Sequence, residues 1–485
     1  MSSYTQDMQP SPPKIGVLIV AYNAENTLTN VLDRIPSEFA PQISAVLVCD
    51  DASHDQTHDA ALAYQRSTTH LPLHVVRHPI NLGYGGNQKA GYAWAHELGL
   101  DVIVLLHGDG QYAPEMLPEM IAPLLNGSAD AVFGSRMLEQ GAARRGGMPL
   151  YKFIGNKILT RWENAMAGTD LSEWHSGYRA YSMSALQKLA LQRNSDGFDF
   201  DTQIILQLHA SGARIVEIPI PTYYGDEICH VDGLKYGRQV MVETFRYRLH
   251  KMGLGSGKYV TQNHAYEMKT SADSSHGVLL RQLSKKSHCH VLDVGCSDGS
   301  LGERVRALGH VVVGIDVECH DLVEDRLDKF IQADLDHGLP KDLPGPFDII
   351  LCADVVEHVR RPDALLNDLR AVVAPGGSLL VSIPNFGHWY PRVRTMFGFF
   401  DYDRRGILDR THVRFFTRRS FERLARSAGY SVQRVACTGF PFDVLSRGNT
   451  KVPRFIIAPL RLIDFALVKI RPPFFAYQFI YELKP

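Results

Sequence analysis

Short apolar runs rich in β-branched residues recur along this chain, and a segment of helix length separates each run from the next. The runs form two series, at 14–22, 45–51, 73–78 and 102–109, and then at 289–296, 310–316, 347–355 and 376–385. Parallel strands need such crossovers, so this alternation predicts sheets that helices cover on both faces. We therefore expect an α/β protein with two doubly wound domains in tandem, whose ligands bind at the carboxyl ends of the strands.

The segment between the two series is polar, contains glycine and shows little periodicity, which is typical of a linker. We expect a first domain at 14–254, a linker at 255–275 and a second domain at 276–485. Residues 1–13 lack a basic start followed by an apolar core, so we interpret them as a disordered leader and not as a signal peptide.

The most apolar late segment, 453–470, predicts a helix with a broad apolar face, ahead of a last strand at 475–483. Arg461, Asp464 and Lys469 interrupt it, whereas a membrane-spanning helix needs about 20 nearly charge-free residues. We expect no transmembrane segment. The apolar face predicts packing within the protein or, as the alternative, contact with a membrane surface.

Composition narrows the classes of function. The 485 residues are 45% hydrophobic, which suffices for two cores, and the net charge of -1 offers no positive field for the phosphates of a nucleic acid. The seven cysteines form no CxxC pair and fit reduced thiols better than a disulfide framework. We expect a cytoplasmic protein that binds no nucleic acid, with peripheral contact at the inner membrane surface left open.

Acidic residues stand at the ends of the predicted strands in the first series. Glu25 follows the first run, Asp51 ends the second, and Asp109 lies between two glycines after the fourth. Carboxylates at these points suit hydrogen bonds to a ribose and a base, or a divalent cation that bridges a diphosphate. A turn is the alternative role for Asp109, because glycine flanks it on both sides.

Eight short segments give these residues a context. In order along the chain they are "AYNAE", "DDASHDQT", "NLGYGGNQKAG", "HGDGQYAPE", "GSR", "SGYRAYS", "GFDFDTQ" and "IPTYYGDE". Together they resemble the family-two glycosyltransferases with the A-type fold, and particularly the polyprenyl-phosphate sugar synthases, over about residues 14–250.

This resemblance implies roles for single residues. Glu25 and Asp51 would contact the nucleobase and ribose of a nucleotide sugar, while Asp109 and Gln111 would ligate Mg2+ or Mn2+ on its diphosphate. His107 is a departure, because the family usually has a second aspartate there. A neutral imidazole can still ligate a divalent metal, but it suits Mn2+ better than Mg2+.

Whether the acceptor side of the site needs a general base depends on the chemistry of the acceptor. Transfer to a hydroxyl needs a general base, whereas an acceptor phosphate is already an anion. Asp201 and His175 are the candidates for a base or for a group that positions the acceptor, and Arg136 and Arg179 would bind phosphates through paired donors. Asp201 could instead cap the helix that follows it. His230 is a further candidate ligand near the diphosphate, with a loop histidine of no function as the alternative.

In the second series, Gly295, Gly299 and Gly302 lie between a strand and a helix. Such a turn lets the backbone approach a ligand and points the helix N-terminus at an anionic group. A dinucleotide fingerprint would need glycines at 295, 297 and 300, and serines occupy the last two positions, so NAD is disfavoured.

The ordered motifs instead resemble the class I methyltransferases that use S-adenosylmethionine, over about residues 265–485. The resemblance implies that the first loop cradles the methionine part, that Asp316 bonds the ribose and that Asp334 meets the adenine amino group. The expected methyl-donor site comprises Asp293, Gly295, Gly299, Asp316, Asp334 and Asp354.

Methyl transfer is an in-line displacement, so the protein positions the acceptor and, for a hydroxyl, removes a proton. His358 is the leading candidate for that base, with His388 and His412 behind it, and His358 could instead order its own loop. Eight arginines and several aromatic residues between 390 and 420 predict either a lid over the site or a surface for an anionic or lipid-linked substrate or an acidic membrane.

These features predict a bifunctional enzyme. It would transfer a sugar from a nucleotide sugar to a glycan, lipid-phosphate or other acceptor, and a methyl group from S-adenosylmethionine to a hydroxyl, in glycan or glycolipid synthesis. Its cofactors would be Mn2+ or Mg2+ and S-adenosylmethionine. Two alternatives stay open: a polyprenyl-phosphate sugar synthase fused to a methyltransferase of an unrelated small molecule, or an inactive first domain that acts as a binding module for an active methyltransferase.

Overall fold

The computed structural model describes residues 12–223, 232–255, 268–269, 271–442 and 454–485. The described residues form two compact units, one that runs up to Arg248 and one that starts at Leu249. Most of the expected leader and linker, and His230, lie outside the described residues.

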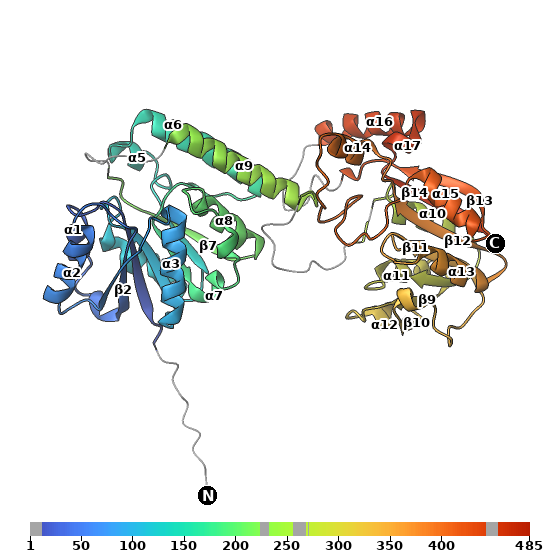
Figure 1. Ribbon diagram of the computed structural model, residues 1–485, viewed down its shortest axis with the longest axis horizontal. Coiled ribbons are helices and arrows are strands. Elements are labelled where there is room, and N and C mark those ends of the chain that lie inside the picture. Colours follow the sequence, from blue (N-terminus) through green and yellow to red (C-terminus); the bar gives the residue numbers. More distant parts are fainter. Residues whose placement is uncertain (1–11, 224–231, 256–267, 270, 443–453) are drawn as a thin grey trace, which may run out of the picture. The chain divides into compact units, whose positions relative to one another are not determined.

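The first unit is built on a seven-stranded sheet (Figure 1). In spatial order its strands are β3 (Leu73–Arg77), β2 (Ile43–Asp50), β1 (Ile15–Ala21), β4 (Val102–His107), β6 (Arg179–Ser182), β5 (Ala131–Ser135) and β7 (Ile215–Pro219). All neighbours are parallel except β6, which runs antiparallel to β4 and β5. Asp50 pairs with Ala21 and His107 with Val20, so the carboxyl ends of β2, β1 and β4 lie side by side.

Helices cover both faces of this sheet. One face carries α1 (Leu28–Asp33), α2 (Thr57–Ser67) and α4 (Leu117–Leu125), and the other carries α3 (Tyr84–Glu97) and α8 (Phe200–Ala210). In β1, Val17 and Ile19 pack into the first core, while Leu18 and Val20 pack into the second. Burial on both sides is why this strand is a continuous apolar run without polar alternation.

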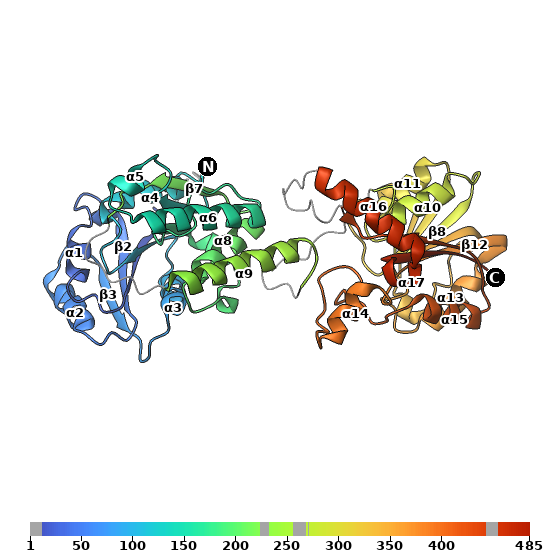
Figure 2. The same cartoon turned by 90° about the horizontal axis from the view of Figure 1, so that it is seen from above.

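Two longer helices, α6 (Leu150–Ala167) and α9 (Gly233–Lys251), lie side by side (Figure 2). Trp162 Nε1 of α6 donates a 3.1 Å hydrogen bond to Thr244 Oγ1 of α9. Both helices expose large apolar side chains, which we call the α6–α9 apolar face: Leu150, Tyr151, Ile154, Ile158, Leu234, Met241, Val242 and Phe245. The first unit also contains the short helices α5 (Ala142–Arg145) and α7 (Met183–Leu186).

The second unit holds another seven-stranded sheet. In spatial order its strands are β10 (Lys329–Gln332), β9 (Val311–Asp316), β8 (His290–Val294), β11 (Phe347–Ala353), β12 (Val373–Pro384), β14 (Gln478–Lys484) and β13 (Ser431–Thr438). The pairs β12–β14 and β14–β13 are antiparallel, and the other neighbouring pairs of this sheet are parallel. The carboxyl ends of β9, β8 and β11 therefore meet at one edge.

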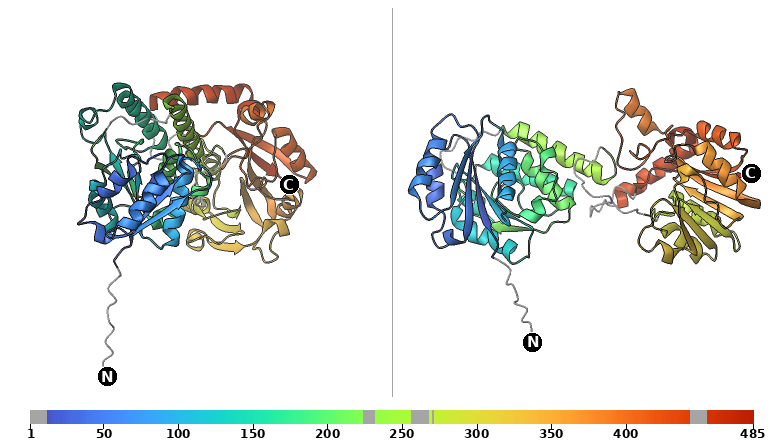
Figure 3. Two further views of the ribbon diagram at one scale, coloured as in Figure 1. Left: turned by 60° about the vertical axis from the view of Figure 1, so that its left-hand side comes forward. Right: turned by 60° about the horizontal axis from the view of Figure 1, so that its bottom comes forward.

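Helices again cover both faces of the sheet, and Figure 3 gives two further views of both units. One face carries α10 (Ser275–Leu283), α11 (Ser300–Ala307) and α12 (Val323–Arg326), and the other carries α13 (Pro362–Ala371) and α15 (Arg418–Ser427). Three more helices are α14 (Trp389–Met396), α16 (Arg454–Ile470) and α17 (Pro472–Phe475). None of the helices in the described ranges is long and apolar enough to cross a membrane.

The predicted fold class, two tandem doubly wound α/β domains, is confirmed, with one difference in each sheet. We expected parallel strands, and the sheets are mixed because β6 and β14 run against their neighbours. β6 is four residues long and too short to give a period. β14 follows β13 through the helices α16 and α17 and returns between β13 and β12 as an antiparallel strand.

Candidate functional site

The loops after β1 and β2 are hydrogen-bonded to each other. The Asn23 N–H donates to Ser53 Oγ at 2.9 Å, and the Ala24 N–H donates to Thr57 Oγ1 at 2.7 Å. Glu25 Oε2 accepts a 2.9 Å bond from the backbone N–H of Gln56. The half-buried Glu25 carboxylate is therefore fixed at the carboxyl edge of the first sheet by the loop that follows β2.

Asp51 ties the end of β2 to the glycine-rich loop ahead of α3. Its Oδ1 accepts a 2.7 Å bond from the Leu82 N–H, and burial raises the pKa of this carboxyl although the Leu82 N–H opposes the rise. A Cβ on Gly85 would lie 2.6 Å from both the Ser195 carbonyl oxygen and Phe200 Cβ. Gly85 thus lets α3 pack closely against the segment that leads into α8.

Asp109 is exposed beyond the end of β4. Its Oδ1 accepts a 3.0 Å bond from the Gln111 N–H, and Gly110 between them has a φ of +78°. Thr27 Oγ1 donates a 2.6 Å bond to the Gly108 carbonyl and fixes the start of this turn. One carboxylate oxygen of Asp109 therefore makes the turn, which leaves the other for a cation. The turn and the metal role are compatible.

His107 ends β4 between two tyrosine rings. Its ring meets Tyr84 and Tyr112 edge-on at centroid distances of 5.5 and 5.0 Å, and a Cβ on Gly177 would lie 2.5 Å from its Cε1. Burial lowers the pKa of His107, against the opposing charges of Asp109 and Asp201. The imidazole is therefore neutral near pH 7.

A chain of hydrogen bonds joins His107 to Asp201. The Tyr84 hydroxyl donates a 2.8 Å bond to Asp201 Oδ2, and the hydroxyl oxygen of Tyr84 lies 3.2 Å from His107 Nε2. Because the tyrosine proton goes to the carboxylate, Nε2 must carry the proton that it shares with Tyr84. The neutral ring then keeps its lone pair on Nδ1, the form that can ligate a metal.

Asp201 lies in the first turn of α8 and is 7% exposed. Besides Tyr84, Gln88 Nε2 donates to it at 3.3 Å, and an Nη2 of Arg179 lies 3.7 Å from Oδ2. The N-cap of α8 is Asp199, so the alternative that Asp201 caps the helix is wrong. Sequence reasoning missed Tyr84, and its position between glycines in the loop 81–91 was the available signal.

The expectation that Arg179 binds phosphates is corrected. Arg179 is 1% exposed on β6, and its guanidinium donates to three backbone carbonyls at 2.8 to 3.0 Å, those of Ser176, Asp201 and Trp174. A phosphate cannot reach it. Its charge instead stabilises the buried Asp201 carboxylate.

Arg136 lies at the end of β5 and is already paired with Glu173. Its Nε donates to Glu173 Oε1 at 3.0 Å and its backbone N–H donates to Oε2 at 2.7 Å. Burial would raise the pKa of Glu173, but the Arg136 charge outweighs it and lowers that pKa. The positive charge of Arg136 is therefore largely compensated before any phosphate binds.

His175 is held by the two long helices. Its Nδ1 lies 2.9 Å from the Tyr236 hydroxyl of α9, and its Nε2 lies 3.1 Å from Glu163 Oε2 of α6. The backbone carbonyl of His175 also accepts a 3.0 Å bond from Arg136. Nδ1 is hydrogen-bonded, and Nε2 faces the buried Glu163 carboxylate without a hydrogen bond among the described residues, so the ring is held between α6 and α9 and suits a positioning role.

In the second unit, β8 ends in a buried carboxylate followed by a glycine turn. Asp293 is 1% exposed, and burial, with the nearby charge of Asp316, raises its pKa to about 7. Gly295 has a φ of +69°, and a Cβ there would lie 2.6 Å from Val355 Cγ2. Gly299 has a φ of +77°. This turn therefore needs glycine for its backbone conformation and, at Gly295, for lack of space.

Asp316 ends β9 beside this turn. Its Oδ2 accepts a 2.8 Å bond from the Ser297 N–H. At the end of β10, the exposed Asp334 accepts a 2.9 Å bond from the Asp336 N–H and lies 3.0 Å from His337 Nδ1. Three neighbouring strands thus bring Asp293, Asp316 and Asp334 to one edge of the sheet.

Asp354 follows β11 at the same edge but already has three partners. It is ion-paired with Lys269, and it accepts bonds from Ser382 Oγ at 2.6 Å and Gln478 Nε2 at 2.8 Å. Burial would raise its pKa, but the Lys269 ammonium outweighs burial and holds the pKa well below its usual range. Sequence reasoning missed Lys269, because it lies in the expected linker.

The three histidines considered for proton removal have different surroundings. His388 caps α14 through a 3.2 Å bond from the Tyr390 N–H to its Nδ1, and burial lowers its pKa to about 4. His388 is therefore a helix-capping residue. His358 and His412 meet edge-on with ring centroids 4.7 Å apart, beside Glu357.

Two known families match this chain in succession. The family described as Glycosyl transferase family 2 matches residues 16–190, and the family described as Methyltransferase domain matches residues 268–435. Each match lies within one of the two units.

Curated relatives also match one unit at a time. The undecaprenyl-phosphate mannosyltransferase of Micrococcus luteus is 32% identical over 208 residues, which are 43% of this chain and 82% of the relative. The UDP-N-acetylglucosamine--dolichyl-phosphate N-acetylglucosaminyltransferase of Methanococcus voltae is 28% identical over 220 residues, 43% of this chain and 86% of the relative. The ubiquinone biosynthesis O-methyltransferase of Paraburkholderia xenovorans is 34% identical over 111 residues, 20% of this chain and 48% of the relative.

Among solved structures, glucosyl-3-phosphoglycerate synthase from Mycobacterium tuberculosis, in complex with Mn2+, UDP and phosphoglyceric acid, matches with 20% identity and a TM-score of 0.38. The match covers 50% of this chain and 82% of that one. The family matches make this chain an enzyme with a glycosyltransferase and a methyltransferase domain. Its N-terminal part belongs to glycosyl transferase family 2 and is similar to the polyprenyl-phosphate mannose synthases, and its C-terminal part is a methyltransferase domain.

Proposed function

We propose that the first unit transfers a sugar from a nucleotide sugar to a polyprenyl phosphate, and that the second transfers a methyl group from S-adenosylmethionine to a hydroxyl in the same glycolipid pathway. One observation carries the first half. The loops after the neighbouring strands β1, β2 and β4 carry Glu25, Asp51 and Asp109, all at the carboxyl edge where doubly wound sheets bind ligands.

Within this edge we assign Glu25 and Asp51 to the nucleoside, and Asp109, Gln111 and His107 to the divalent cation. The residues fit a cation, because Asp109 offers an exposed carboxylate oxygen and the Tyr84 bond leaves a lone pair on His107 Nδ1. A carboxylate with an imidazole favours Mn2+ over Mg2+. When bound, the cation neutralises the diphosphate leaving group.

The lipid acceptor is supported by the α6–α9 apolar face. Exposed basic residues lie on the same two helices, among them Lys157, Arg161 and Arg238. Helices with exposed apolar and basic side chains bind the surface of anionic membranes. α6 also carries the buried Glu163, which lies 3.1 Å from His175, so this helix links the apolar face to the proposed acceptor side of the site.

For the methyl donor, the fit rests on the turn after β8. The Oδ2 atom of Asp293 is buried and has no hydrogen-bond partner among the described residues, which points to a missing polar ligand. We assign Asp293, Gly295, Gly299, Asp316 and Asp334 to S-adenosylmethionine. Asp354 would contribute to methyl-donor binding only indirectly, because its carboxylate is ion-paired with Lys269.

The proposal is tested with the full-length protein and vesicles that contain a polyprenyl phosphate. Labelled nucleotide sugars are supplied one at a time with Mn2+, and labelled S-adenosylmethionine is then added. We expect label from one nucleotide sugar in the lipid fraction, and methyl label in the same product. Binding of a nucleotide sugar without transfer to any acceptor would support the second candidate, a binding module, which the substitution at His107 favours. Methyl label that enters only water-soluble molecules would contradict the shared pathway.

A further inference from the structure

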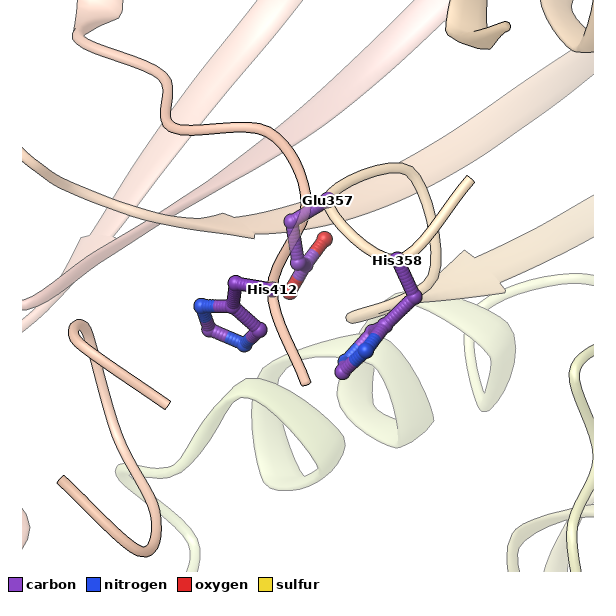
Figure 4. A group of neighbouring side chains, drawn as sticks. All are labelled: Glu357, His358 and His412. Atoms are coloured by element: carbon purple, nitrogen blue, oxygen red, sulfur yellow. The ribbon is translucent and has the colours of Figure 1, made fainter. Parts of the chain in front are cut away.

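Three side chains in the second unit point toward one another outside the expected methyl-donor loop (Figure 4). Glu357 and His358 lie in the turn after β11, and His412 comes from the segment between α14 and α15. One ligand atom from each lies within 4.8 Å of the other two. The carbonyl of Glu357 accepts 3.0 Å bonds from the N–H groups of Val413 and Arg414, which fastens the two segments together.

Backbone carbonyls fix the tautomer of both imidazoles. Nδ1 of His358 lies 3.2 Å from the carbonyl oxygen of Thr411, and Nδ1 of His412 lies 3.2 Å from that of Ile407. A carbonyl can only accept, so each Nδ1 carries the proton and each Nε2 keeps its lone pair. A histidine whose other nitrogen donates to a backbone carbonyl is arranged as metal-ligating histidines are.

Glu357 is buried, and its carboxylate makes no hydrogen bond within the described part of the chain. Its exposed fraction is 1%. Burial, with the nearby charge of Asp354, raises its pKa, and Asp409 adds to the rise while Lys269 opposes it. Burying an unpaired polar group costs free energy, and a cation bound to this carboxylate would offset that cost.

We propose that Glu357, His358 and His412 bind a divalent metal ion through one carboxylate oxygen and two Nε2 atoms. Two imidazoles and one carboxylate are the donor set of catalytic zinc sites, in which a further position stays open for water or substrate. The site differs from the one proposed at Asp109 in both its unit and its ligands.

The metal site lies at the carboxyl edge of the second sheet, after β11 and beside β8, whose loop we assign to S-adenosylmethionine. The open position of the metal is therefore available to the methyl acceptor. A hydroxyl of the methyl acceptor that binds there has a lowered pKa and loses its proton to solvent. Its oxygen then forms the bond to the methyl carbon, and the breaking carbon–sulfur bond leaves its electron pair on sulfur. This step rests on the proposed methyl transfer, whereas metal binding does not. His358 becomes a ligand and not the general base.

Metal binding is tested directly on the full-length chain. The protein is stripped with EDTA, titrated with Zn2+ by calorimetry without nucleotide, and analysed for bound metal after dialysis. In a parallel titration with Co2+, the visible absorption of the bound ion reports the number and type of its ligands. We expect Glu357→Gln, His358→Ala and His412→Ala each to lose one equivalent of bound Zn2+ and the Co2+ band.

The control is His288→Ala, an exposed histidine ahead of β8 at the opposite edge of the sheet. This variant should bind Zn2+ and Co2+ with the stoichiometry of the unchanged protein. His358 is exposed, so its replacement leaves the fold intact even if a change at Glu357 does not. If His358→Ala binds Zn2+ with the stoichiometry and affinity of the unchanged protein, the metal site is overturned. Binding of S-adenosylmethionine, measured on the same samples, reports separately on the proposed methyl transfer.

Discussion

Nε2 of His107 lies 3.2 Å from the hydroxyl oxygen of Tyr84, and this contact determines which nitrogen of the neutral imidazole keeps its lone pair. Tyr84 gives its own proton to Asp201, so His107 must donate through Nε2. The neutral ring is therefore held with its lone pair on Nδ1, the tautomer that our proposed metal site requires.

Tyr84→Phe is the first prediction. The change removes the hydroxyl that orients His107 and leaves Asp201 without its 2.8 Å donor. Loss of such an outer partner typically weakens metal binding by about 10- to 100-fold, and we expect that range for Mn2+ in the presence of nucleotide. The measurement is the Mn2+ dependence of sugar transfer, together with the signal of free Mn2+ in electron paramagnetic resonance.

Tyr64→Phe is the matched control, because the Tyr64 hydroxyl of α2 also donates a 2.8 Å bond to a carboxylate, that of Asp33 on α1, and neither residue belongs to the candidate site. It should leave the Mn2+ dependence unchanged. Equal Mn2+ dependence in Tyr84→Phe and the unchanged protein would show that the hydrogen-bond chain does not set the metal site.

His107→Asp tests the metal preference. An aspartate offers a hard anionic ligand, so we expect the ratio of sugar-transfer rates in Mg2+ and Mn2+ to rise. The comparison uses one protein preparation with each metal in turn. Activity that is absent before the change and appears after it would establish that the natural first unit is a binding module.

How much could be predicted from sequence is seen in β1 and β6. β1 is a buried run of seven residues whose type and position were predicted, and Asp51 and Asp109 followed from the ends of two equally clear runs. β6 has four residues and no period, so Arg179 on it was expected to bind phosphates, whereas it is buried in the sheet.

The hydrogen-bond and ion-pair partners of the site residues could not be predicted from the sequence, for a different reason. Tyr84 and Asp201 are 117 positions apart, and Lys269 and Asp354 are 85 apart. No local pattern records such contacts, because they depend on which helix packs on which strand. The clustering of Glu357 and His358 with His412 likewise appears only when two distant loops meet.

Asp293 gives a prediction about pH. Its pKa in the folded protein is raised to about 7, whereas an unfolded aspartate titrates near ~3.9. Between these values the folded state binds a proton that the unfolded state lacks, so stability falls as pH rises, by about 1.4 kcal/mol per pH unit. Asp293→Asn removes this term.

We therefore expect Asp293→Asn to gain stability relative to the unchanged protein as pH rises from 5 to 7, and the difference to level off above about pH 7. Urea unfolding of both proteins at several pH values, followed in the second unit, measures it. A difference that is constant across this range would contradict the raised pKa.

Asp316→Ala tests the methyl-donor site. A hydrogen bond to a charged group contributes about 1.5–3 kcal/mol, so its loss should weaken S-adenosylmethionine binding by roughly 10- to 150-fold. Sugar transfer should be unaffected if the units act independently. Asp321→Ala, an exposed acid five residues later, is the control for a general change in charge. Calorimetry with S-adenosylmethionine distinguishes the two variants, and equal affinity for both would remove Asp316 from the site.

The α6–α9 apolar face predicts binding to membranes. Ile154 and Ile158 are 48% and 63% exposed one turn apart on α6, so Ile154→Glu with Ile158→Glu places two charges where apolar side chains would enter the lipid. We expect flotation with vesicles of 30% anionic lipid to fall at least about tenfold, because each buried apolar side chain of this size contributes about 1.5–3 kcal/mol. Ile80→Glu makes the same substitution at a 66% exposed isoleucine outside both helices and should float normally. If the α6 variant also floats normally while sugar transfer to the lipid acceptor persists, the acceptor reaches the first unit without this surface.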